Sequence, residues 1–141
     1  MTSNRAAPTL VVGLGCQRGC PVSTLRALLD QALQAHQIEL RMIKALASID
    51  LKRDEPGLIE LAAQLSLPLM YFSSEQLARY QSQLSHQSQI AFERTGCYGV
   101  AESAALALAE QLVEAPAKLL VSRQKYAQAT LAVASAAQPQ R

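Results

Sequence analysis

The chain has 141 residues, of which 50% are hydrophobic, 17% are charged and 4% are aromatic. This length fits one domain that buries its own core, and the composition favours helices over a β-sandwich. The formal net charge of +2 comes from 13 basic and 11 acidic residues spread along the chain, so nucleic acid is not an expected partner.

The sequence also lacks the patterns of membrane and secreted proteins. Its apolar runs are far shorter than the ~18 residues of a membrane helix, and no signal-peptide pattern precedes them. We therefore expect no membrane partner and a cytoplasmic location. The cysteines, Cys16, Cys20 and Cys97, are expected to be free thiols. Their spacing is not that of a zinc knuckle, so neither a metal nor a cofactor is predicted.

The most informative segment is an apolar strand at residues 9–14 that runs through a glycine-rich turn into a helix. The first N–H groups of a helix lack intrahelical partners and attract carboxylates and phosphates. The glycine spacing is not the dinucleotide fingerprint and no Walker motif occurs, so a plain tight turn is an alternative interpretation. The candidate ligand-binding residues here are Gly13, Gly15, Cys16, Arg18 and Gly19.

Strands and helices alternate along the next part of the chain. Ser23 or Thr24 is expected to cap the helix that follows the glycine turn. Residues 45–49 and 69–72 are predicted as short buried strands with a helix between them. This alternation predicts a parallel sheet with helical crossovers.

Polar residues mark where two of these helices begin. Asp54 or Glu55, just before Pro56, is expected to cap the helix after the charged loop at residues 50–57. Ser73 is the start of a Ser-x-x-Gln pattern that is typical of a capping box.

The last third of the chain predicts a helix and a hairpin. Gly99 precedes a helix with many alanines, whose small side chains would let it approach the sheet closely. Residues 118–122 and 129–134 are β-like runs, and the gap at 123–128 is short enough for a hairpin.

The predicted fold class is therefore α/β, with a mixed, mostly parallel sheet flanked by helices and a C-terminal β-hairpin. We expect a single domain at residues 9–135, with flexible segments at 1–8 and 136–141. In such a sheet, ligands bind where the strands end. The segments 13–19 and 48–57 would then meet along one rim, together with the turn at 96–100.

Several segments resemble the CobE/CbiG C-terminal family of cobalamin biosynthesis proteins, in family order. The most specific is Ser-Ile-Asp-Leu-Lys-Arg-Asp-Glu-Pro-Gly at residues 48–57, because its charged core has no evident packing purpose. The chain resembles the short, stand-alone members over residues 11–134. The other matching stretches lie within residues 13–19, 45–58, 67–73, 96–106 and 125–130.

The resemblance implies a protein of the aerobic cobalamin pathway that binds or processes a corrin or precorrin intermediate. Longer members open a lactone and release a two-carbon fragment, so a hydrolase similar to cobalt-precorrin-5A hydrolase is an alternative. Other cobalamin biosynthesis enzymes are implied as further partners. Corrin precursors carry several carboxylates, which Arg18, Lys52 and Arg53 would match by charge.

The charged loop also offers candidate catalytic groups. Asp50 could act as a general base and Lys52 as a proton donor, or the two could form a solvated ion pair. Cys16 could be a nucleophile activated by the start of a helix, or simply a small turn residue. The candidate ligand-binding residues beyond the glycine turn are Ser48, Asp50, Lys52, Arg53, Gly96, Gly99 and Lys125.

Two other functions would fit parts of the sequence. A nucleotide-binding module would use the glycine-rich turn, and an interaction module would dock the alanine-rich helix onto a partner enzyme.

Overall fold

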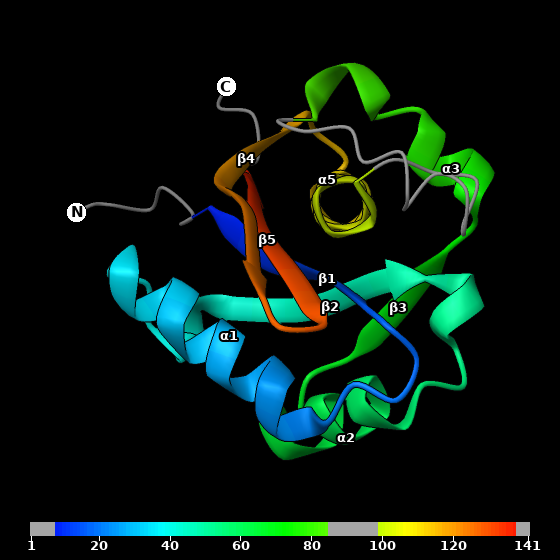
Figure 1. Cartoon of the computed structure of the whole chain (residues 1–141). Coiled ribbons are helices and arrows are strands. Elements are labelled where there is room, and N and C mark those ends of the chain that lie inside the picture. The colour runs from blue at the N-terminus through cyan, green and yellow to red at the C-terminus, as the bar shows by residue number, and fades with distance from the viewer. Residues whose placement is uncertain (1–7, 85–98, 138–141) are drawn as a thin grey trace.

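The computed structural model describes residues 8–84 and 99–137. In these residues one mixed sheet has the strand order β3-β2-β1-β5-β4 (Figure 1). The first three strands in the chain pair in parallel, and β5 runs antiparallel to both β1 and β4. This arrangement confirms the predicted α/β fold and its C-terminal hairpin. The strands are β1 (Thr9–Cys16), β2 (Ile43–Ile49), β3 (Leu69–Phe72), β4 (Ala117–Tyr126) and β5 (Ala129–Ala136).

Helices cover both faces of the sheet. The helices α1 (Val22–Ala35) and α2 (Pro56–Leu65) lie on one face, and α5 (Val100–Val113) lies on the other with α3 (Ser74–Ala78) beside it (Figure 1). Within residues 8–84 and 99–137, no helix is long and apolar enough to cross a bilayer. Short 3-10 helices are η1 (Leu40–Met42), η2 (Asp50–Lys52) and η3 (Gln81–Gln83).

The helix α5 packs unusually close to the central strand β1. A Cβ atom on Gly13 would overlap the carbonyl oxygen of Ala101 and lie 2.7 Å from the amide nitrogen of Ala105. The α5 residues from Ala101 to Ala109 are all buried, so this helix has no solvent-exposed face over these two and a half turns. The expected close approach of an alanine-rich helix is therefore confirmed.

The predicted helix starts were only partly correct. Ser73 accepts the amide hydrogen of Gln76 and completes the predicted capping box. Ser23 and Thr24 do not cap α1, because the helix already begins at Val22 after Pro21. A proline in this position fixes the backbone angle without needing a side-chain acceptor. Glu55 stands before α2 but makes no cap hydrogen bond to it, because its carboxylate is bound elsewhere.

The hairpin is tighter than its sequence indicates. The strand β4 continues to Tyr126, and only Ala127 and Gln128 form the turn, so the predicted loop at 123–128 is wrong over most of its length. Polar side chains at an exposed sheet edge do not prevent strand formation, because they remain in solvent. Two irregularities interrupt the pairing of β4 with β5, one between Leu119 and Val121 and one between Val121 and Gln124.

We predict that Gly13→Ala destabilises the fold by about 3 kcal/mol, because the added methyl group meets helix backbone that cannot move aside. Urea unfolding followed by circular dichroism measures this loss. Gly15→Ala is the matched control, since its new methyl group would meet the hydroxyl of Thr130, which can rotate. Equal stability of the two variants would contradict the close packing of α5 on β1.

Candidate functional site

Three segments meet at the edge where the parallel strands end. The strands β1, β2 and β3 are neighbours, so the loops after them share one edge of the sheet. The Glu55 carboxylate accepts the amide hydrogen of Gly19 at 2.8 Å, which joins the β2 loop to the glycine-rich turn. A Cβ atom on Gly15 would lie 3.8 Å from Val100, which places the start of α5 beside the end of β1. The described parts of the three predicted rim segments therefore lie close together.

The amides of the glycine-rich turn are already bound within the protein. Cys20 donates to the carbonyl of Gln17, which closes a β-turn whose third residue, Gly19, has φ +81°. The Gln17 amide donates to the carbonyl of Gln128, and the Gly19 amide donates to Glu55. The carboxylate predicted to bind this turn is therefore one that the chain itself supplies, and the turn has few donors left for a phosphate.

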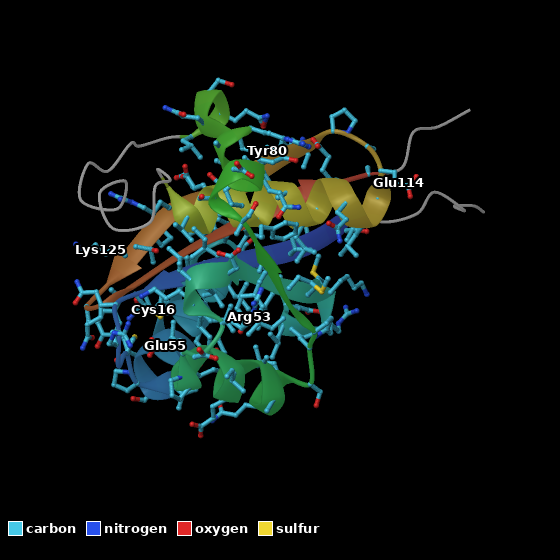
Figure 2. The ribbon with its side chains drawn as sticks, turned by 90° about the vertical axis from the view of Figure 1, so that its right-hand side faces the viewer. Cys16, Arg53, Glu55, Tyr80, Glu114 and Lys125 are labelled. Carbon is cyan, nitrogen blue, oxygen red and sulfur yellow. The ribbon has the colours of Figure 1, made fainter. Side chains whose placement is uncertain are left out.

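Cationic side chains remain available along the rim. Arg18 and Arg53 are exposed, and Lys52 is partly exposed. The Arg53 guanidinium lies 5.8 Å from the centre of the Tyr71 ring, which orients it over the end of β3. Figure 2 shows Cys16, Glu55 and Lys125 toward the same side of the molecule, whereas Glu114 lies at the opposite end of α5.

Lys125 reaches the rim through the register of the sheet. Lys125 pairs with Thr130, and Thr130 pairs with Gly15 near the end of β1. Directly opposed residues of antiparallel strands place their side chains on one face. Because a Cβ atom on Gly15 would face Val100, Lys125 stands on the face of the sheet that carries the start of α5.

Some predicted site residues are used by the fold itself. Gly13 makes room for α5, and the hydroxyl of the buried Ser48 donates to the carbonyl of Leu14 at 2.7 Å. Gly99, with φ +55°, allows the chain to enter α5. Asp50 begins η2 at the rim and is partly exposed. Gly96 lies outside the described residues.

The thiol of Cys16 is not an activated nucleophile in this structure. Burial, the neighbouring thiol of Cys20 and the carboxylate of Glu55 raise the pKa of Cys16 from 9.0 to about 12, and Lys52 opposes them only in part. A thiol with this pKa stays protonated at neutral pH. The interpretation of Cys16 as a small turn residue therefore agrees better with its surroundings.

Sequence reasoning missed the part that Glu55 plays. Glu55 is only 6% exposed, although it lies in a charged segment that suggests a solvated loop. The sequence does contain one signal of this contact, which is Gly57. A Cβ atom at this position would overlap the carbonyl oxygen of Cys20, so the glycine lets the start of α2 pack against the glycine-rich turn.

A separate hollow lies between α3 and α5, away from the residues of the rim. It has a volume of about 200 Å³, and Phe72, Arg79 and Gln111 are among its lining residues. The Tyr80 hydroxyl donates to Glu110 at 2.8 Å inside it. Burial and this hydrogen bond raise the pKa of Tyr80 to about 12. No residue of the glycine-rich turn or of the 50–57 loop is among those that line it.

We predict that Glu55→Ala lowers the free energy of unfolding by about 1 kcal/mol, because the Gly19 amide loses a charged acceptor in a partly buried hydrogen bond. Amide hydrogen exchange at Gly19 should accelerate at the same time. Glu55→Gln keeps an acceptor oxygen and should lose less stability. Unchanged exchange at Gly19 in Glu55→Ala would show that this hydrogen bond does not hold the turn.

We also predict that iodoacetamide modifies Cys16 at pH 8 about a thousand-fold more slowly in the folded protein than in urea, because so little thiolate forms. Peptide mass spectrometry after timed quenching measures the rate. The folded thiol keeps its proton to higher pH than the unfolded thiol, so raising the pH from 9 toward 12 should destabilise the fold. Rapid modification at pH 8 would contradict the raised pKa.

Comparison with known sequences identifies relatives over nearly the whole chain. The Cobalamin synthesis G C-terminus family matches residues 10–134. Protein CobE from Sinorhizobium sp. is 34% identical over 135 residues, which cover 96% of this chain and 85% of that protein. Cobalt-precorrin-5A hydrolase from Priestia megaterium is 35% identical over 97 residues, which cover 69% of this chain but only 25% of that protein.

Solved structures support the same assignment. The crystal structure of CobE, a protein from the cobalamin biosynthetic pathway, has a TM-score of 0.91 at 41% identity and covers 98% of this chain and 97% of its own. The crystal structure of cobalamin biosynthesis protein chiG from Agrobacterium tumefaciens has a TM-score of 0.68 at 32% identity. The match covers 89% of this chain and 96% of the chiG chain. The chain thus belongs to the Cobalamin synthesis G C-terminus family, which places it in cobalamin biosynthesis.

Proposed function

We propose that this protein binds a corrin or precorrin intermediate at the rim and holds it for another enzyme of cobalamin biosynthesis. The observation that carries the proposal is the gathering of cationic side chains from separate segments where the parallel strands end. Arg18 follows β1, Lys52 and Arg53 follow β2, and Lys125 lies near the end of β4. Such intermediates carry several carboxylates, so cations spread over a broad edge match them better than one deep pocket would.

The rim is held in shape before any ligand arrives. The hydrogen bond from Gly19 to Glu55 fixes the turn that carries Arg18. Tyr71 donates its hydroxyl to the carbonyl of Arg53 at 3.4 Å and lies beneath its guanidinium. A surface that is already ordered loses less conformational entropy on binding. The planar guanidinium groups of Arg18 and Arg53 suit bidentate contacts with carboxylates.

A lactone-opening hydrolase is the second candidate function, favoured by the similarity to cobalt-precorrin-5A hydrolase. In that case Asp50 would act as the general base and Lys52 would polarise the carbonyl group of the lactone. The chain spans about a quarter of the length of that relative, so the binding function is the simpler proposal. Release of an aldehyde from a lactone-bearing precorrin would distinguish hydrolysis from binding.

We predict that the protein binds cobyrinic acid, a corrin with free carboxylates, and binds its heptamethyl ester far more weakly. Absorbance titration and calorimetry measure both affinities. Arg18→Ala and Lys52→Ala should each weaken binding about two- to five-fold, as expected for exposed charge pairs, and added salt should reduce the difference.

Arg41→Ala is the matched control, because Arg41 lies in η1 before β2 and so at the opposite edge of the sheet. Its affinity for cobyrinic acid should equal that of the unaltered protein. Equal binding of the acid and the ester would refute recognition through carboxylates. If Arg41→Ala weakens binding of cobyrinic acid as much as Arg18→Ala does, the rim is not the binding site.

A further inference from the structure

The strand β4 contains two extra residues relative to β5. From Leu119 to Val121 it advances two positions while β5 advances one, and from Val121 to Gln124 it advances three while β5 advances two. Each irregularity is a β-bulge, which leaves one residue of the longer strand outside the ladder. The second bulge contains Ser122 and Arg123.

A buried carboxylate binds the backbone at the second bulge. Glu102, in the first turn of α5, is 1% exposed, and its Oε2 accepts the amide hydrogen of Arg123 at 2.7 Å. A bulged residue cannot use its amide in the regular ladder, and a buried amide without a partner is costly. Glu102 therefore provides the acceptor that lets this bulge form beneath α5.

The second bulge decides which side chain faces the rim. With the bulge, Lys125 lies opposite Thr130 on the face that carries the start of α5. A regular ladder continued from the pair of Val121 with Val133 would put Gln124 opposite Thr130 instead. A slip of one residue moves each side chain to the other face of a sheet. Lys125 would then point away from the rim.

We infer that Glu102 is a positioning residue that sets the register of the hairpin tip and thereby places Lys125 at the corrin-binding rim. The inference rests on the proposed function for its ligand, but the register itself is a property of the free protein. Glu102 acts through the backbone of Arg123 and has no direct contact with the ligand in this scheme.

Amide exchange and ligand affinity test the two halves of this inference separately. Glu102→Ala should accelerate hydrogen exchange of the Arg123 amide, whereas Glu102→Gln retains an acceptor oxygen and should protect it. Glu102→Ala should also weaken binding of cobyrinic acid about two- to five-fold, which is the loss expected for Lys125→Ala. Lys118→Ala, at the other end of β4, is the control and should bind normally.

A double-mutant cycle separates positioning from a general loss of stability. If Glu102 acts through Lys125, Glu102→Ala combined with Lys125→Ala should bind no more weakly than Lys125→Ala alone. Additive losses would overturn the inference. If the unaltered protein does not bind cobyrinic acid, the proposed function fails. Exchange of the Arg123 amide that is fast in Glu102→Ala and slow in the unaltered protein would then still support the effect of Glu102 on the hairpin.

A second variant covers the case in which Glu102→Ala does not fold. Exchanging two neighbours, as Gln124→Lys with Lys125→Gln, keeps Glu102, the composition and the net charge but moves the lysine to the other face. Its affinity for cobyrinic acid should fall to that of Lys125→Ala. Unchanged affinity would show that the register of the hairpin tip does not matter for binding, and would overturn the inference.

Discussion

The contact of α5 with β1 is the constraint on which the rest of the structure depends. Gly13 lies in the central strand of the sheet, and the backbone of α5 occupies the space that any side chain there would need. This contact sets the height of α5 above the sheet. It therefore also sets the position of Val100 beside Gly15 and of Glu102 against the hairpin.

Two internal carboxylates shape the edge where the strands end. Glu55 binds the amide of Gly19, and Glu102 binds the amide of Arg123. Both are buried, and each accepts a hydrogen bond from backbone that departs from the regular pattern, Gly19 in a turn and Arg123 at a bulge of β4. Glu55 and Glu102 thus hold the glycine-rich turn and the hairpin in place, while Arg18 and Lys125 on these segments remain exposed. This division of roles gives the rim a fixed shape and leaves cationic side chains at its surface.

The fold was largely predictable because hydrophobic periodicity and turn residues determine it. The strand at 69–72 and the capping box at Ser73 agree with the structure. The start of α1 was not predicted, because the helix begins after Pro21 and not after a Ser or Thr cap. The length of β4 was not predicted, because the polar residues at its end are typical of a loop but also fit an exposed edge strand. The meeting of the three rim segments followed from the parallel order of the strands, which the alternation of strands and helices indicates.

The chemistry of the candidate site was less predictable, because it depends on contacts between residues far apart in the sequence. The partner of Glu55 is 36 residues away, so nothing in the loop itself shows that its carboxylate is occupied. The raised pKa of Cys16 depends first on burial, which a turn sequence does not reveal. The face of the sheet on which Lys125 lies depends on a β-bulge, and the pattern of apolar residues does not indicate where a bulge occurs.

The sheet order has a consequence for how the chain folds. The central strand β1 precedes the other strands in the chain, yet one of its two neighbours, β5, is formed by residues 129–136, and Thr9 pairs with Ala136. One of the two edges of β1 thus stays unpaired until residues 129–136 have been synthesised. Contacts of such long sequence separation slow folding. Completion of the domain during translation therefore waits for its last strand.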